Sequence, residues 1–141
     1  MSRLLALDVG DERTGVALSD EQEQLARPLE MVPRRRGPAG FLRIAELVRT
    51  HDVRAIVVGL PLLPDGSEGK QVASTRAFGR GLERPVSVPI IYHDERETTR
   101  RALEILAAEG QSPKKRAQQV DAAAAAVLLQ DYIDEQASRN P

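Results

Sequence analysis

The chain has 141 residues, of which 41% are hydrophobic and 29% charged, and these proportions are typical of a single globular domain spanning residues 1–141. The absence of cysteine excludes disulfides and thiolate metal sites and fits a cytoplasmic location. The formal net charge of −1 argues against a domain that holds nucleic acid by overall charge alone. No apolar run approaches the roughly 18 residues of a membrane span, and residues 1–3 lead into a strand pattern without the features of a signal peptide, so we expect no membrane association.

The first half of the chain predicts three strands, a helix and a fourth strand. Residues 4–9 and 16–19 are apolar runs on either side of a turn-rich segment, which predicts a hairpin, and residues 27–32 predict a third strand. Apolar residues then recur at helical spacing up to His51. The continuous apolar run of residues 55–59 predicts a central parallel strand that is buried on both faces.

The second half of the chain predicts one more strand among helices. Residues 67–82 have a weak helical pattern interrupted by glycines, and residues 89–93 predict a strand. We expect one helix over residues 98–110 and a last helix over residues 113–136, which opens on a serine followed by proline. Strands that alternate with helices indicate an α/β fold. The predicted sheet is mixed and five-stranded, with a three-strand antiparallel meander, two parallel strands and helices on both faces.

Three acidic residues stand out by their positions. Asp8 ends the first strand, Glu95 follows the last strand, and Asp121 lies within an apolar helix segment whose next residues are small. Small residues let a helix lie close to a sheet, which would carry Asp121 toward the carboxyl ends of the central strands. Buried carboxylates need a cation or hydrogen-bond donors, so a shared metal ion is an economical reason for the three to meet. Hard oxygen ligands favour Mg²⁺ or Mn²⁺ over zinc.

Each acid also has a structural interpretation. Asp8 could serve as a turn or cap residue, and Asp121 could face the solvent. Glu95 could form a surface ion pair with a nearby arginine, Arg96 or Arg100. The positions of the three acids together indicate a metal site more strongly than any one of them does.

Three local clusters of basic residues could hold the phosphates of a nucleic-acid strand. They are residues 34–36, the arginines at 96, 100 and 101, and residues 114–116. Each cluster could instead be a solvated loop or helix face. Lys114 and Lys115 occupy the first turn of the predicted last helix, where the helix dipole disfavours a positive charge. Their unfavourable position indicates that they face phosphate groups. The candidate nucleic-acid contacts are Arg13, Thr14, Arg96, Arg100, Lys114, Lys115 and Arg116.

Four segments, in order along the chain, resemble the YqgF (RuvX) family. They are residues 7–17 (LDVGDERTGVA), 56–61 (IVVGLP) followed by Asp65-Gly66, 93–96 (HDER) and 120–125 (VDAAAA). The resemblance implies a ribonuclease H-like fold and nuclease activity, because the family is described as a Holliday junction resolvase and as the nuclease that completes the 5′ end of 16S ribosomal RNA. Its acidic residues fall on Asp8, Glu95 and Asp121, which become the expected catalytic and metal-ligating residues.

Two features of the sequence depart from that family's pattern. Residues 97–99 (ETT) replace the more common Leu-Ser-Thr and add an acid. Ala124 stands where junction resolvases of this fold carry a second carboxylate on the last helix. The missing ligand weakens the expectation of tight two-metal binding and of junction resolution.

The sequence therefore favours a nuclease in which two Mg²⁺ or Mn²⁺ ions lie between Asp8, Glu95 and Asp121, with Asp8 as the bridging ligand. RNA and DNA are both candidate substrates, pre-ribosomal particles are candidate partners, and cutting two strands of a junction would require a homodimer. One alternative is an actin-like ATPase fragment, although those proteins close a second lobe over the nucleotide, for which 141 residues leave no room. The other is a non-catalytic nucleic-acid-binding factor in ribosome assembly.

Overall fold

A computed structural model describes residues 2–95 and 113–139, and for residues 113–121 it describes the backbone alone. The elements are β1 (Arg3–Val9), β2 (Arg13–Ser19), β3 (Ala26–Pro33), α1 (Ala39–Thr50), β4 (Val53–Leu60), α2 (Lys70–Leu82), β5 (Ile90–Asp94) and α4 (Pro113–Arg139). The helix expected over residues 98–110 lies outside the described residues. No described helix combines the length and the apolar character that crossing a membrane requires.

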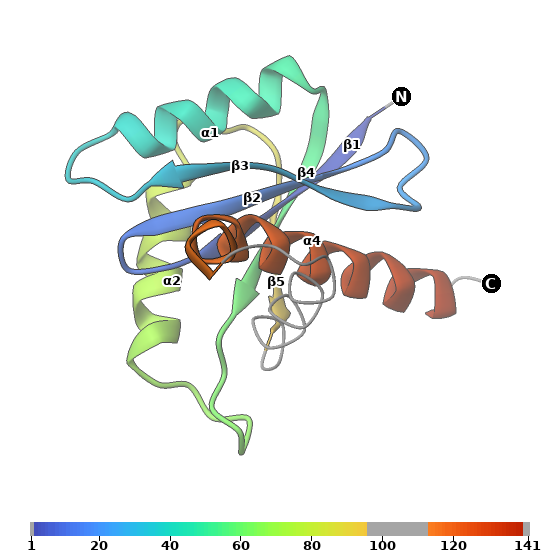
Figure 1. Ribbon diagram of the computed structural model, residues 1–141. Coiled ribbons are helices and arrows are strands. Elements are labelled where there is room, and N and C mark those ends of the chain that lie inside the picture. Colours follow the sequence, from blue (N-terminus) through green and yellow to red (C-terminus); the bar gives the residue numbers. More distant parts are fainter. Residues whose placement is uncertain (1, 96–112, 140–141) are drawn as a thin grey trace.

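The five strands form one mixed sheet in the order β3-β2-β1-β4-β5 (Figure 1). β1, β2 and β3 pair antiparallel as a meander, whereas β4 pairs parallel with β1 and β5 pairs parallel with β4. α1 and α2 cover one face of the sheet and α4 covers the other, as the two main hydrophobic clusters show. The predicted α/β architecture, with its meander and two parallel strands, is confirmed.

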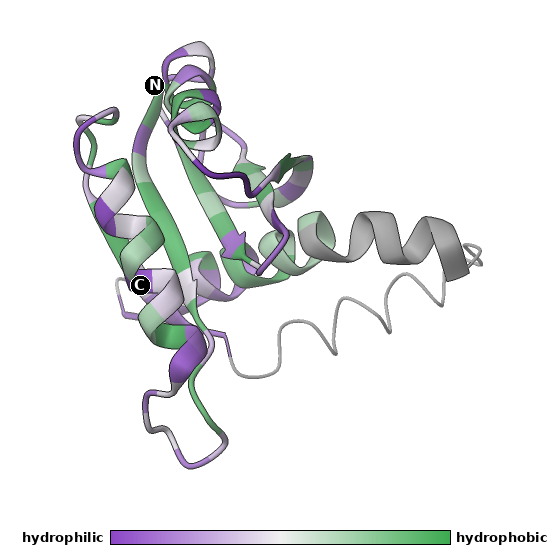
Figure 2. Ribbon diagram, turned by 90° about the vertical axis from the view of Figure 1, so that its left-hand side faces the viewer, coloured by the Kyte–Doolittle hydropathy of each residue, from purple (hydrophilic) through white to green (hydrophobic). Residues whose placement is uncertain are grey.

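Alternating side chains of the central strands divide the core into two layers, and Figure 2 shows hydrophobic residues concentrated on these strands. The layer toward α1 and α2 includes Leu5, Leu7, Val16, Leu18, Ile56 and Val58. The layer toward α4 includes Leu4, Ala6, Ala17, Ala55 and Val57. Because successive residues of a strand point to opposite faces, Asp8 continues the α4-facing series of Leu4 and Ala6.

α4 crosses the sheet at close range because its central residues are small. Ala124 and Ala125 are buried, and Leu128 and Leu129 are completely buried in the layer below the helix. The helix contacts β1, β2, β3 and β4. It continues to Arg139, three residues beyond the predicted end.

The hairpin between β1 and β2 is tighter than the sequence predicted. β2 begins at Arg13 instead of Val16, because the Gly10 N–H donates a hydrogen bond to the Arg13 carbonyl (2.9 Å) and the ladder pairs Val9 with Thr14. Arg13 and Thr14 therefore belong to a strand and not to the turn. α2 begins at Lys70, three residues later than predicted, after a loop that contains two prolines.

We predict that Ala125→Leu destabilises the fold by about 1–3 kcal/mol, because the added atoms have no space between α4 and the sheet. The free energy of unfolding in urea measures this effect. Ala137→Leu is the matched control, since Ala137 is exposed on the same helix and the change there should cost less than about 0.5 kcal/mol. Equal effects at the two positions would contradict the close packing of α4.

Candidate active site

Asp8 and Glu95 reach the same edge of the sheet because β1, β4 and β5 run parallel. The β4–β5 register pairs Leu60 with Asp94, and the Glu95 N–H donates a hydrogen bond to the Leu60 carbonyl (3.1 Å). The β1–β4 register pairs Leu7 with Val58, so that Asp8 lies beside the next residue of β4, Gly59. Two acids that are 87 positions apart in the sequence thus meet at the carboxyl ends of adjacent strands.

The space for the Glu95 carboxyl group is provided by Gly59. A Cβ atom at position 59 would overlap Glu95 Oε2 and would lie 2.9 Å from Leu128 Cδ2. The Glu95 side chain therefore lies directly over the Gly59 backbone, next to the α4 residue Leu128. A glycine inside a strand often marks such a close approach.

The two carboxyl groups are hydrogen-bonded to each other, and this contact changes the acidity of Glu95. The pKa of Glu95 is raised from the ordinary value of 4.5 to about 10, chiefly by burial and then by the negative charge of Asp8, its hydrogen bond and the charge of Asp94. Glu95 Oε2 is buried and has no hydrogen-bond partner in the described part of the chain. At neutral pH the pair is therefore held together by a shared proton.

This pair fits a divalent cation. Two carboxylates close enough to share a hydrogen bond repel each other when both are ionised. A cation between them would balance both charges in place of the proton. The buried, unpartnered Oε2 is a ready ligand, and oxygen-only donors match Mg²⁺ or Mn²⁺. Among the described side chains no group of three or more His, Cys, Asp or Glu could hold a metal ion. The side chain of Asp121 is not among them, so the third ligand stays a prediction.

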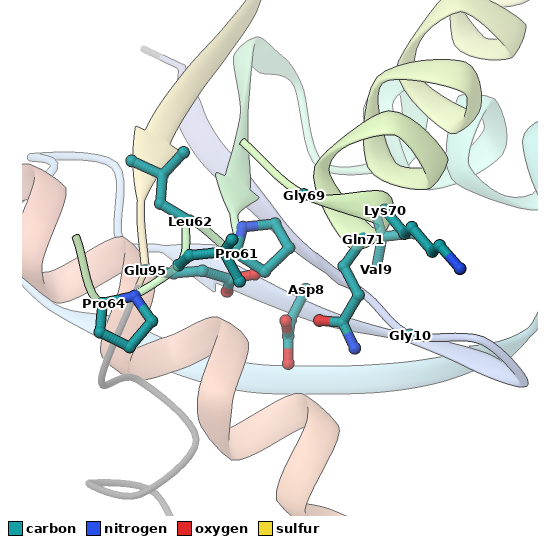
Figure 3. Close-up of a pocket in the computed structure, with 11 residues that line it drawn as sticks. Asp8, Val9, Gly10, Pro61, Leu62, Pro64, Gly69, Lys70, Gln71 and Glu95 are labelled. Carbon is teal, nitrogen blue, oxygen red and sulfur yellow. The ribbon is translucent and has the colours of Figure 1, made fainter. Parts of the chain in front are cut away.

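The acid pair opens into a pocket of about 580 Å³, shown in Figure 3. The pocket lies between the β1 end, the loop after β4 and the start of α2, and its lining includes Gly10, Pro61, Gly69, Lys70 and Gln71. The Gln71 amide points into the pocket toward Asp8, whereas the Lys70 ammonium points away from it (Figure 3). The N-terminus of α2 adjoins the pocket. No described side chain caps it and its first turn contains no acid, so its partial positive charge is not neutralised there.

The other predicted site residues that the structure describes lie in two places, the start of β2 and the first turn of α4. Thr14 is buried in β2 opposite Val9, and Arg13 begins the same strand beside the hairpin. Lys114, Lys115 and Arg116 occupy the first turn of α4, as predicted, but their side chains are outside the description. Arg96 and Arg100 also lie outside the described residues. The structure therefore brings together two of the three predicted acids and leaves the basic contacts as predictions.

Three residues of the site, Gly59, Lys70 and Gln71, were not predicted from the sequence. Gly59 carried a usable signal, because an isolated glycine at the end of an apolar strand indicates a close approach of another group. Lys70 and Gln71 carried none, since their place at the pocket depends on how the proline-rich loop after β4 returns the chain to α2.

Comparison with known proteins gives a consistent result. A family model described as "RuvX: Holliday junction resolvase" matches residues 2–135. A protein from Syntrophus aciditrophicus is 46% identical over 134 residues, covering 94% of this chain and 88% of the relative, and one from Chloroflexus aggregans is 41% identical over 138 residues, covering 98% and 96%. Both carry the name "Putative pre-16S rRNA nuclease".

Two solved structures share the fold at low sequence identity. Thermus thermophilus RuvC, in complex with a Holliday junction substrate, has a TM-score of 0.58 and 15% identity, over 97% of this chain and 96% of that one. Fowlpox virus resolvase, in complex with Holliday junction DNA, has a TM-score of 0.59 and 10% identity, over 95% and 98%. These likenesses establish the ribonuclease H-like fold predicted from the sequence.

The raised pKa of Glu95 leads to a prediction about stability and pH in the absence of metal. Between pH 4.5 and about 10 the unfolded chain has lost this proton while the folded chain retains it, so the stability of the wild type falls as the pH rises through this window. Glu95→Gln removes the effect. In EDTA at pH 8 its free energy of unfolding should exceed that of the wild type by on the order of a few kcal/mol.

Urea unfolding at pH 4.5, 6 and 8 measures this difference, which should shrink toward pH 4.5. Glu12→Gln, at an exposed position of the hairpin, is the matched control and should show no such pH dependence. A difference between Glu95→Gln and the wild type that is constant with pH would show that the Glu95 carboxyl titrates normally.

The contact between Gly59 and Glu95 leads to a double-mutant prediction. Gly59→Ala should destabilise the chain by about 1–3 kcal/mol, because the new methyl group overlaps the Glu95 carboxyl group and crowds Leu128. In a Glu95→Ala background the overlap with the carboxyl group is absent, so the same change should cost about 1 kcal/mol less. Urea unfolding of the four proteins gives this coupling energy, and a value near zero would mean that the two residues do not meet.

Proposed function

The chain belongs to the RuvX family, and we propose that it is a metal-dependent nuclease that matures the precursor of 16S ribosomal RNA by hydrolysing a phosphodiester bond near its 5′ end. Family membership supports a hydrolase that acts on nucleic acid. The observation that carries the proposal is the pair of facing carboxyl groups, Asp8 and Glu95, at the end of a pocket open to solvent. The substrate rests on the names of relatives such as those from Syntrophus and Chloroflexus.

Asp8 and Glu95 would hold the cation, with Asp121 of α4 as the proposed third ligand. Mg²⁺ or Mn²⁺ bound there would supply an acidified water and a positive charge for the leaving oxygen. In the hydrolysis the water oxygen forms a bond to phosphorus, the bond from phosphorus to the 3′-oxygen breaks, and that oxygen takes up a proton. We propose that two ions bind, as the sequence predicts. Titration of the protein with Mn²⁺ would give this number.

The remaining residues of the pocket would position the substrate. The uncapped N-terminus of α2 presents backbone N–H groups and a partial positive charge beside the acids, which suits a phosphate group. The Gln71 side chain extends into the pocket beside Asp8 (Figure 3), and its amide group could donate a hydrogen bond to a substrate oxygen there. The basic residues 114–116 at the start of α4 are proposed to hold the phosphates of the flanking strand.

Branched DNA is the second candidate substrate. The description of the family model, and the two solved structures that contain junction DNA, favour it. Against it stands Ala124, which is buried on α4 and offers no oxygen ligand where a fourth carboxylate would be needed. Action on a junction would also require a homodimer. Cleavage of a single RNA strand does not require a homodimer.

We predict that Asp8→Asn lowers the rate of cleavage more than about 100-fold without loss of stability, because it removes a ligand charge that is unfavourable in the metal-free chain but keeps the side-chain shape. The assay uses labelled pre-16S RNA, single-stranded RNA, duplex DNA and a four-way junction, each with Mg²⁺ or Mn²⁺. Asp11→Asn, at an exposed position of the same hairpin, is the matched control and should cleave like the wild type.

Three outcomes would contradict the proposal or part of it. Wild-type cleavage by Asp8→Asn would remove Asp8 from the catalytic site. Binding of RNA that EDTA leaves unchanged, without cleavage of any substrate under any metal condition, would instead support a non-catalytic assembly factor. Cleavage of the junction and of no RNA would move the substrate to branched DNA.

A further inference from the structure

We propose that a second pocket, on the opposite face of the sheet from the acid pair, binds a backbone phosphate of the nucleic acid through Thr14, Arg35 and the N-terminus of α1. The identification of the ligand as nucleic acid rests on the function proposed above. The pocket itself rests on observations that are independent of the acid pair.

The pocket has a volume of about 160 Å³, which is enough for a phosphate group and ordered water. It lies where the start of β2, the end of β3, the start of α1 and the middle of α2 meet. Its polar lining comes from Thr14, Arg34, Arg35 and the glycines at 37 and 40, and its apolar walls include Phe41 and Phe78. None of its lining residues, all of which the structure describes, is acidic.

The buried hydroxyl group of Thr14 is the feature that indicates a ligand. Thr14 lines the pocket and is only 1% exposed. Its Oγ1 atom has no hydrogen-bond partner in the described chain. A buried hydroxyl without a partner destabilises a fold, and valine would fill the same space in a strand without that penalty. Packing alone therefore does not explain a hydroxyl here, whereas a ligand oxygen that accepts its hydrogen bond does.

The charge around the pocket selects an anion. Arg35 is exposed and makes no hydrogen bond or ion pair with the described residues, so its guanidinium is available. Arg34 is already fixed, because it donates to the Gly10 carbonyl (3.0 Å) and lies 5.5 Å from the centre of the Phe78 ring, but it still contributes positive charge. Guanidinium groups match the geometry of phosphate oxygens.

The first turn of α1 adds backbone donors. This 12-residue helix begins after Pro38 with no capping side chain and no acidic residue in its first turn, and the first intrahelical N–H is that of Leu42. The N–H groups of the preceding residues, which include Gly40 and Phe41 of the pocket lining, have no partner within the helix. Free N–H groups beside a buried hydroxyl and an arginine form an anion site.

The position of the pocket fits a strand that passes over the edge of the sheet. Thr14 pairs directly with Val9, the neighbour of Asp8, but its side chain follows the α1-facing series of Val16 and Leu18. The acid pair and the second pocket therefore lie at the same edge of the sheet, on opposite faces, with the short hairpin between them. One nucleic-acid strand crossing the hairpin could place one phosphate at each.

The test measures the affinity of the full chain for a fluorescein-labelled single-stranded RNA in EDTA, which prevents cleavage. Thr14→Val and Arg35→Gln should each weaken binding about tenfold. Arg36→Gln is the matched control, because Arg36 is an adjacent, exposed arginine outside the pocket, and it should change the affinity less than about twofold. Arg35→Gln should also reduce the dependence of log K on log salt by about one charge, and Thr14→Val should not.

A second readout shows where the anion binds. Addition of inorganic phosphate should shift the NMR signals of the Gly40 and Phe41 amides in the wild type and shift them much less in Thr14→Val. The melting temperature of Thr14→Val should equal or exceed that of the wild type, so that a loss of affinity cannot come from unfolding.

Wild-type RNA affinity in both Thr14→Val and Arg35→Gln would overturn the assignment to nucleic acid, and if phosphate still shifted the two amides, the pocket would be a site for free phosphate. An absence of any amide shift would overturn the pocket as an anion site. Asp8→Asn separates the two proposals, because it should lose cleavage but keep both RNA affinity and the phosphate shifts. If no protein cleaves any substrate while Thr14→Val still weakens RNA binding, the proposed catalysis fails and the second pocket stands.

Discussion

The contact between two carboxyl groups, Asp8 and Glu95, is the constraint on which the rest of this structure depends. Both groups are acids, and one of them is buried deeply enough that its pKa rises to about 10. A fold that kept its acids apart would avoid this penalty, since carboxylates are most stable in water or beside a positive charge. The arrangement is therefore unfavourable in the metal-free chain, and a bound cation would turn it into a favourable one.

The packing around the pair prevents its relaxation. The sheet fixes the two backbones through parallel pairing on either side of β4. Gly59 provides the space that the Glu95 carboxyl group occupies, and Leu128 of α4 packs beside it. Two hydrophobic layers, one on each face of the sheet, supply the stability that holds this geometry. Rigid strands and a close helix would both serve a cation site, because such a site needs ligands that do not move.

The sequence predicted the features that follow from local pattern. Apolar runs indicated the strands, and the ends of parallel strands indicated where Asp8 and Glu95 would meet, before any contact was known. Features that arise between distant segments could not be predicted in this way. Three such features depend on how separate elements pack: the overlap that excludes a side chain at Gly59, the place of Gln71 at the pocket and the unpartnered hydroxyl of Thr14. The start of β2 depends on one hydrogen bond across the hairpin.

The distribution of charge resolves an apparent conflict between the function and the composition. A net charge of −1 gives the chain no general attraction for a polyanion, and the acid pair alone would repel one. At the edge of the sheet, however, the charges lie in separate pockets, with Glu95 packed beside Leu128 of α4 and arginines 34 and 35 in the pocket between β3, α1 and α2. The short hairpin lies between the two pockets, so under the proposals above attraction and catalysis would act on one strand. A chain built this way would need no overall positive charge, because its affinity would be local.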